Sequence, residues 1–497
     1  MIKYAVYLSI KNLTQVSKKT SCVLKINDEG KDCVVKKYLS RAVRLIIFVV
    51  ILCVLYAGFD YMISDDTAAQ TRVTFHDYYK AGKIDYLFIG PSHSSHEINA
   101  VQLSEDLGKN VFNLSTVDQD FIGTYYIIKE AAKLKKTDHI FLELSVSRLT
   151  IKAADETAVY IITDYMKSPL IKVKYLLSSF DMEGYINAFL RLRRNIDPQK
   201  LPKADKLTKI NRAKSDPAYS GYAGTEKYMG KGQWAAWSSW ANEDTGTAAL
   251  NLNMRGLNNF TVDAIQEREL EHLYKIIKLC KDEGIDLTFI IPPYSELYLY
   301  RFEKYDEVTQ KFYDAAEENG IPVVDFNRVK EEYLDLKLAD FYNSDHVNSD
   351  ASPRIADFLA QYIRDPEGDY FYDSVEDKYP MNDDIIAVGY NRFLVTDEGE
   401  YTKKDSVEGT INSLRLEISA FSRVKRPVNV RMCVTEQTED EDPVWIDGAE
   451  VKGEKLDEYT TQFTVSYNDL KTDYRVALLD PKTNKVLYEA VTRFNTD

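Results

Sequence analysis

The chain has 497 residues, of which 44% are hydrophobic and 28% are charged, as in globular proteins and unlike disordered ones. Its net charge is −15, although residues 1–44 alone carry +7, so the remainder is strongly acidic and nucleic acid is excluded as a partner. The five cysteines are too few and too scattered for a disulfide framework or a zinc site, and we expect neither a metal nor a cofactor.

The first predicted element is a membrane anchor. Residues 45–63 are apolar except for Gly58 and Asp60, and this length spans a bilayer. The basic residues 1–44 are expected to stay in the cytoplasm, which makes the protein a single-pass protein of the cell membrane with an extracytoplasmic body. A cleaved signal peptide is the alternative, but the basic lead is long and no A-x-A site follows Ile63. We interpret residues 64–80 as a linker.

Residues 81–366 have the pattern of an α/β domain. Short apolar runs alternate with segments of helical spacing, which indicates a parallel sheet with helices on both faces. The strands are predicted at 85–89, 110–114, 140–144, 287–291 and 322–326, and the helices at 121–134, 263–281 and after Pro353.

A long insertion, about residues 150–260, interrupts this pattern. Residues 160–190 have helical spacing, and Trp234, Trp237 and Trp240 follow at intervals of three. Insertions of this length are typical of lids or binding elaborations, so the tryptophans are candidate platforms for a sugar ring or an acyl chain. Alternatively, they form the buried face of a short helix. Residues 367–497 alternate as half-buried strands, which predicts a separate β-sandwich without a catalytic constellation.

Ser92 is the first candidate nucleophile. It follows the strand at 85–89 directly after Gly90-Pro91, which places its hydroxyl at the carboxyl edge of the sheet, where ligands bind in such folds. The alternative is that Ser92 or Ser94 only caps the next helix. An acyl-transferring serine needs a histidine as base, and His346 lies in a loop just before the last helix of the domain. A parallel sheet can bring the two together.

Three segments, GPSH at 90–93, FNLS at 112–115 and FYNSDHVN at 341–348, resemble the SGNH/GDSL hydrolase superfamily. The similarity is greatest to the membrane-anchored branch that accompanies membrane-bound O-acyltransferases in cell-surface polysaccharide acylation. Relatives of that branch act in alginate acetylation and in D-alanyl transfer to lipoteichoic acid. The resemblance covers about residues 80–364 and implies a flavodoxin-like, three-layer α/β fold without a cofactor.

The resemblance also implies roles for single residues. Ser92 would be the nucleophile, with its backbone N–H in the oxyanion hole, and His346 would be the general base. Ser115 stands at the usual glycine position and would supply a second N–H. Asn113 would assist with its side chain, or else only cap the strand end.

Two departures from the family pattern concern the acid and the oxyanion hole. The acid position, three before the histidine, is Asn343, while Asp345 is adjacent to His346. Either residue could orient the imidazole, or the activity is low. No Gly-x-Asn-Asp block follows the third strand, where LELSVSR offers Glu143, Ser145 and Arg148 instead.

The leading hypothesis is an extracytoplasmic, membrane-anchored serine acyltransferase or esterase that moves or removes an acyl group, such as acetyl, on a cell-surface polysaccharide. A membrane-bound O-acyltransferase would be its partner. The alternative is a catalytically inactive, membrane-tethered protein that binds glycans or serves as a scaffold in polymer acylation. A metal site at His93, His96 and Glu97 is a third hypothesis, although no further well-spaced ligand accompanies them.

Overall fold

The computed structural model describes residues 31–63, 69–150, 155–190, 226–237, 259–379, 387–401 and 408–421, with the remaining C-terminal strands and a few single residues besides. Trp240 and residues 1–30 lie outside the described part of the chain. The N-terminal helix and the body are described separately below.

The N-terminal helix α2 (Lys31–Ile63) contains a segment that is long and apolar enough to cross a membrane. This segment, Tyr38–Asp60, has 23 residues and a mean hydropathy of 2.6. It overlaps the predicted anchor at 45–63, but the helix begins earlier, so residues 31–44 of the predicted tail continue the same helix. The orientation across the membrane remains a prediction.

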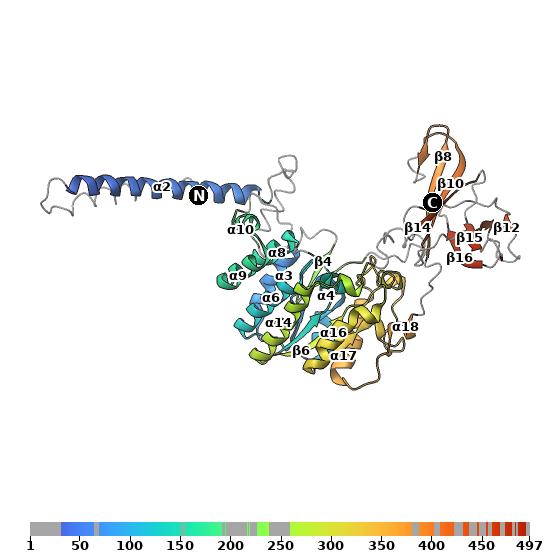
Figure 1. Ribbon diagram of the computed structural model, residues 1–497, viewed down its shortest axis with the longest axis horizontal. Helices are drawn as coiled ribbons and strands as arrows, with labels where there is room; N and C mark the ends of the chain where they lie inside the picture. The colour runs from blue at the N-terminus through green and yellow to red at the C-terminus, as the bar shows by residue number, and fades with distance from the viewer. Residues whose placement is uncertain are drawn as a thin grey trace. The chain divides into compact units, whose positions relative to one another are not determined.

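The body contains a parallel five-stranded sheet with the order β2-β1-β3-β6-β7 (Figure 1). Neighbouring strands all run in the same direction, which is the flavodoxin-like arrangement and confirms the predicted fold class. The strands lie within one or two residues of their predicted positions: β1 Tyr86–Ile89, β2 Val111–Asn113, β3 His139–Glu143, β6 Asp286–Ile291 and β7 Val323–Asp325.

Helices cover both faces of this sheet because its strands are apolar on both sides. In β1, Leu87 and Ile89 belong to one hydrophobic core and Phe88 to the other. The first core is covered by α3 (Ala69–Lys80), α6 (Phe121–Leu134), α14 (Glu267–Glu283) and α16 (Tyr305–Asn319), and the second by α5 (Ala100–Leu107) and α17 (Ser352–Arg364). Shorter helices are α4 (Ser92–Glu97), α7 (Val146–Leu149), α15 (Glu296–Leu299) and α18 (Val375–Lys378).

Three predicted boundaries need correction. Residues 69–80 are not part of a linker but form α3, whose Phe75 and Tyr78 are buried in the core. The predicted helix at 160–190 is three helices, α8 (Glu156–Thr163), α9 (Pro169–Ser179) and α10 (Met182–Phe189). Pro169 begins α9, where its missing N–H costs nothing, and Asp181 caps α10. The α/β domain also extends beyond residue 366, because Tyr370 is buried in its second core.

Part of the insertion forms a hairpin, β4 (Lys227–Gly230) and β5 (Gln233–Ala235), which packs between two parts of the body. The N–H of Asn113 in β2 donates to the carbonyl of Lys231 (2.9 Å), and the N–H of Ser349 donates to the carbonyl of Ala236 (2.8 Å). Gly232 has a φ of +84°, and a β-carbon there would overlap the carbonyl of Asn113. Glycine is therefore required for this close approach.

The C-terminal region consists of two antiparallel sheets, with the orders β13-β14-β10-β8-β9 and β12-β11-β15-β16. All strands of these two sheets lie within residues 367–497, the region predicted to form strands. Their bounds are β8 Ala387–Thr396, β9 Glu400–Tyr401, β10 Ile411–Phe421, β11 Arg431–Glu436, β12 Trp445–Ile446, β13 Glu454–Lys455, β14 Thr460–Tyr467, β15 Asp473–Leu479 and β16 Val486–Arg493.

A buried acidic pair in the body generates a prediction about stability. Glu269, in the first turn of α14, is fully buried, and burial together with the charge of Asp120 raises its pKa to about 7. A carboxyl whose pKa is raised on folding favours the folded state when it is protonated. This contribution to the unfolding free energy is fully present below the unfolded pKa and is lost as the pH rises through the folded pKa of about 7.

We therefore expect Glu269→Gln to raise the melting temperature relative to wild type more at pH 8 than at pH 5. The difference in unfolding free energy should be on the order of 2 kcal/mol. Thermal unfolding of both proteins at the two pH values measures it. Glu271→Gln, an exposed residue on the same helix, is the matched control. An equal shift at both pH values would contradict the prediction.

Candidate active site

The nucleophile candidate is placed by the turn between β1 and α4. β1 ends at Ile89, and α4 begins with Ser92 as its first residue. Gly90 is needed between them because a β-carbon there would overlap the side chain of Glu143 on the neighbouring strand β3. As the first residue of a helix, Ser92 has a backbone N–H without an intrahelical acceptor. Both its hydroxyl and its N–H are thus available at the carboxyl edge of the sheet.

His346 reaches Ser92 from a tight loop before α17. The loop is closed by backbone hydrogen bonds, from the N–H of Tyr342 to the carbonyl of His346 (3.0 Å) and from the N–H of Asn348 to the carbonyl of Asp340 (2.7 Å). The Nε2 atom of His346 lies 2.8 Å from Oγ of Ser92, although 254 positions separate the two residues. This is the distance of a nucleophile paired with its general base.

Both candidates for the orienting residue lie next to the other ring nitrogen of His346. Its Nδ1 atom is 3.1 Å from Oδ1 of Asn343 and 3.3 Å from Oδ1 of Asp345. The Asn343 oxygen also accepts the backbone N–H groups of Asp345 and His346, so it shapes the loop. Burial would raise the pKa of Asp345, but its hydrogen bonds to His346 and His93 hold the pKa well below the usual range. Asp345 therefore supplies the negative charge beside the imidazole.

His93 and Glu143 complete the site, and sequence reasoning gave neither of them this role. The Nδ1 atom of His93 lies 2.9 Å from Oε1 of Glu143, and its Nε2 atom lies 3.4 Å from Oδ2 of Asp345. The other Glu143 oxygen accepts the N–H of Ser94 (2.8 Å). His93 thus bridges two carboxylates while its ring stacks on that of His346, with centroids 4.5 Å apart.

This arrangement separates the pKa values of the two stacked histidines. Burial alone would lower the pKa of His93, but Glu143 and Asp345 more than offset burial and raise it well above the usual range. Burial and the charge of His93 lower the pKa of His346, despite the opposing effect of Asp345. His93 is therefore the cation of the pair, and His346 stays neutral and able to accept a proton.

The residues predicted for the oxyanion hole lie at the site but are largely engaged with one another. Nδ2 of Asn113 donates to the carbonyl of Ser94 (2.6 Å), and Oδ1 of Asn113 accepts the N–H of Ser115 (3.2 Å). Asn113 therefore ties the end of β2 to the nucleophile helix. The Ser115 hydroxyl is buried and has no hydrogen-bond partner within the described part of the chain.

The predicted metal ligands do not converge. His96 turns its Nδ1 atom toward the carbonyl of Ser92 (2.8 Å), and its Nε2 atom is 3.3 Å from Oε1 of Glu226. Glu97 is fully buried and accepts the N–H of Val347 (3.4 Å). Among the described residues, the group close enough to share an ion consists of His93, Asp345 and His346, which are already paired with one another and with Ser92.

The tryptophans do not form a common platform. Trp234 is only 1% exposed, and its indole N–H donates to Oγ1 of Thr74 (3.0 Å), so it is a core residue with no open face. It lies on a strand rather than on the short helix considered above. Trp237 is 48% exposed, and Trp240 lies outside the described residues.

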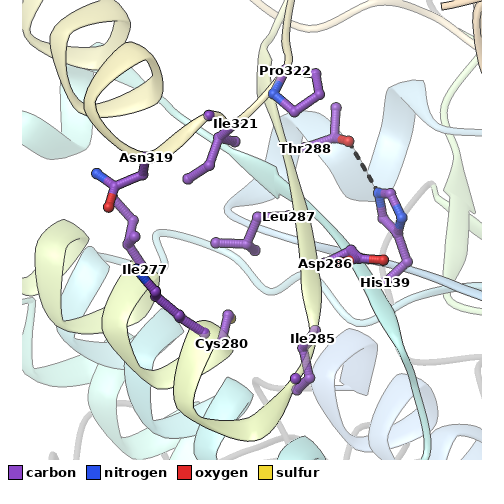
Figure 2. A pocket seen from close by; sticks show the side chains of 13 residues that line it. His139, Ile277, Cys280, Ile285, Asp286, Leu287, Thr288, Asn319, Ile321 and Pro322 are labelled. Carbon is purple, nitrogen blue, oxygen red and sulfur yellow. Dashed lines mark hydrogen bonds between the residues drawn. The ribbon is translucent and has the colours of Figure 1, made fainter.

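A hollow of about 530 Å³ lies at the opposite edge of the sheet from Ser92, and Figure 2 shows the residues that line it. It is formed by the beginnings of β3 and β6 and by the ends of α14 and α16. His139 there pairs with Thr288 (3.0 Å), and burial raises the pKa of the Cys280 thiol to about 12, so this thiol is unreactive.

Comparison with known proteins adds little to this geometry. No family model matches the chain, and no curated protein matches it. Among solved structures, one match is the crystal structure of a candidate acylhydrolase from Bacteroides fragilis, with 9% sequence identity and a TM-score of 0.28. The match covers 61% of this chain and 99% of that protein. So distant a likeness says nothing about activity, and the assignment depends on the site itself.

The charge of Asp345 generates the first prediction about activity. Asp345→Asn keeps the shape of the side chain but removes the charge that stabilises protonated His346, so kcat for a short-chain aryl ester should fall by up to the order of 10⁴. Asp350→Asn, an exposed neighbour beside the same loop, is the control and should be nearly neutral. A small effect of Asp345→Asn together with a large effect of Asn343→Ala would instead identify Asn343 as the orienting residue.

The second prediction concerns His93. His93→Gln removes the charge that, after burial, does most to lower the pKa of His346, so that pKa should rise. Because protonated His346 cannot act as a base, the acidic limb of the pH–rate profile should move to higher pH. The groups that face His93 are Glu143, Asp345, Glu97, His346 and the ring of Tyr294.

A pH–rate profile of kcat/KM with the aryl ester measures this shift. His139→Gln, a half-buried histidine at the opposite edge of the sheet, should leave the profile in place. A loss of rate in His93→Gln without any displacement of the acidic limb would mean that His93 acts only as a structural residue.

Proposed function

We propose that the protein is an extracytoplasmic, membrane-anchored serine acyltransferase or esterase that acts on acyl esters of a cell-surface glycan. The observation that carries the proposal is the 2.8 Å contact between Oγ of Ser92 and Nε2 of His346. The contact is supported by the low pKa of His346, which keeps the base neutral, and by the adjacent carboxylate of Asp345.

The chemistry follows from these positions. Oγ of Ser92 attacks the ester carbonyl while His346 takes its proton, and the resulting imidazolium is stabilised by Asp345. His346 then returns the proton to the departing alcohol, which leaves an acyl group on Ser92. Attack by water completes hydrolysis, whereas attack by a sugar hydroxyl completes transfer.

The negative charge that develops on the carbonyl oxygen needs hydrogen-bond donors. The N–H of Ser92 is suited to this role because it opens α4 and has no acceptor within the helix. The second amide hydrogen of Asn113 is a further candidate, since one of its amide hydrogens is committed to Ser94. The N–H of Ser115 is a weaker candidate because Asn113 already accepts it.

The proposal also includes a glycan substrate and a membrane-bound O-acyltransferase as partner. They rest on the resemblance of the three motifs to the branch that works beside membrane-bound O-acyltransferases and on the anchor-like helix α2. The alternative, a non-catalytic glycan-binding protein, relied in part on the tryptophans. The burial of Trp234 removes one of those aromatic surfaces.

The test is labelling with a serine-reactive fluorophosphonate probe. We expect the wild-type protein to be labelled and Ser92→Ala to lose both labelling and hydrolysis of a short-chain aryl ester, because Ser92 supplies the hydroxyl that contacts Nε2 of His346 in the described part of the chain. Ser95→Ala, on the same helix, should remain labelled. A folded wild-type protein that resists the probe and has the same background hydrolysis as Ser92→Ala would favour the binding-protein alternative.

A further inference from the structure

Helix α10 presents an apolar side to solvent. Met182, Ile186, Phe189 and Leu190 are spaced as one helical face, and their side chains are between 37% and 72% exposed. The opposite side is the one that packs on the body, through the small residues Gly184 and Ala188. This is the reverse of an ordinary surface helix, whose large apolar residues face the core.

The preceding helix α9 also exposes large apolar residues, and basic residues are frequent in the sequence on both sides of α10. Leu170, near the start of α9, and Leu177, near its end, are 75% and 61% exposed, and the exposed Lys174 lies between them. The whole chain has a net charge of −15, but residues 167–194 are basic, with only two acidic residues, Asp181 and Glu183. The six basic residues of this range are Lys167, Lys172, Lys174, Arg191, Arg193 and Arg194. Exposed large apolar residues with a basic surround are typical of helices that lie in a lipid interface.

Helix α10 lies at the carboxyl edge of the sheet, the edge that carries Ser92. Ser178, at the end of α9 and just before α10, contacts Tyr126 (2.6 Å) in the first half of α6. α6 begins at the carboxyl edge because it follows the carboxyl end of β2. The hydroxyl of Tyr160 in α8 also donates to the carbonyl of Gly184 in α10 (3.1 Å).

The chain that arrives from α2 enters the body at this same edge. In α3, Thr74 pairs with Trp234 of the hairpin that packs on the end of β2, whereas the carbonyl groups of Tyr78 and Tyr79 accept from Lys136, just before β3 begins. α3 therefore starts at the carboxyl edge and ends at the amino edge. Five residues separate Ile63, the end of α2, from Ala69, the start of α3, and they span at most about 20 Å.

We propose that the apolar face of α10, with the end of α9, lies in the interface of an anionic phospholipid bilayer. Docked in this way, the helix pair would hold the carboxyl edge of the sheet, and with it Ser92, toward the membrane surface. The five residues between α2 and α3 keep the body close to the membrane. The exposed apolar side chains contribute favourable free energy of insertion into the bilayer, and the basic residues attract anionic headgroups. The proposal depends on the insertion of α2 into the membrane and is independent of the chemistry at Ser92.

The test uses full-length protein in vesicles of phosphatidylcholine and anionic phosphatidylglycerol. Single-cysteine variants carry an environment-sensitive fluorophore at Ile186→Cys, at Leu134→Cys or at the native Cys53, with the other cysteines replaced. Leu134 is 40% exposed, close to the 37% of Ile186, but lies at the amino-edge end of α6, and Cys53 reports insertion of α2. Lipids that bear a nitroxide quench only fluorophores in contact with the bilayer.

We expect quenching at positions 53 and 186 and none at 134, and we expect Phe189→Asp to reduce the quenching at 186 several-fold. Quenching at 53 alone would overturn the docking of α10 while leaving the anchor intact. Protection of position 186 from aqueous iodide without quenching by lipid would mean that protein covers this face, which also overturns the proposal. Absence of quenching at 53 would overturn the proposal as well, because it requires α2 to be inserted in the bilayer.

Discussion

The site depends on one buried imidazole that holds two carboxylates. His93 lies in the nucleophile helix, Glu143 ends a central strand, and Asp345 belongs to the loop of the base, so the bridge fixes three separate segments relative to one another. A buried carboxylate without a partner is costly, and removing any member would leave another charge unpaired. Gly90 is part of this arrangement because any larger residue would push Glu143 away from His93.

The bridge also gives Asp345, the proposed orienting acid, two partners. In the usual triad a carboxylate serves one histidine, whereas Asp345 contacts both His93 and His346, whose rings stack in parallel. Sharing spreads its negative charge over two imidazoles, and the positive one opposes protonation of the other. The base therefore remains neutral although the His346 side chain is still 14% exposed. In the proposed reaction, the same repulsion would make the imidazolium of His346 a strong proton donor to the leaving group.

The sequence predicted the sheet and the main pair of the site because both have local signals. Each strand is a short apolar run ended by glycine, proline or a polar residue, and Ser92 and His346 follow from their places beside such runs. The role of Glu143 could not be predicted. A buried carboxylate can pair with a histidine from any part of the chain, and no local pattern connects Glu143 with His93. Trp234 was misjudged because a spacing of three suggests a helix, whereas the segment is a strand. Helix α3 was missed because most of its residues are polar.

The hairpin of the insertion has a consequence for solubility. β2 is an edge strand of the parallel sheet, and the unpaired backbone groups of such a strand invite pairing with another chain. Here the N–H of Asn113 donates to the carbonyl of Lys231, whose ammonium group contacts Asn110 just before the strand (2.7 Å). The close fit of Gly232 leaves no room for a foreign strand at that point. The insertion thus protects the open edge of the sheet against intermolecular β-pairing. Covering segments and edge lysines have this effect in many proteins that contain β-sheets.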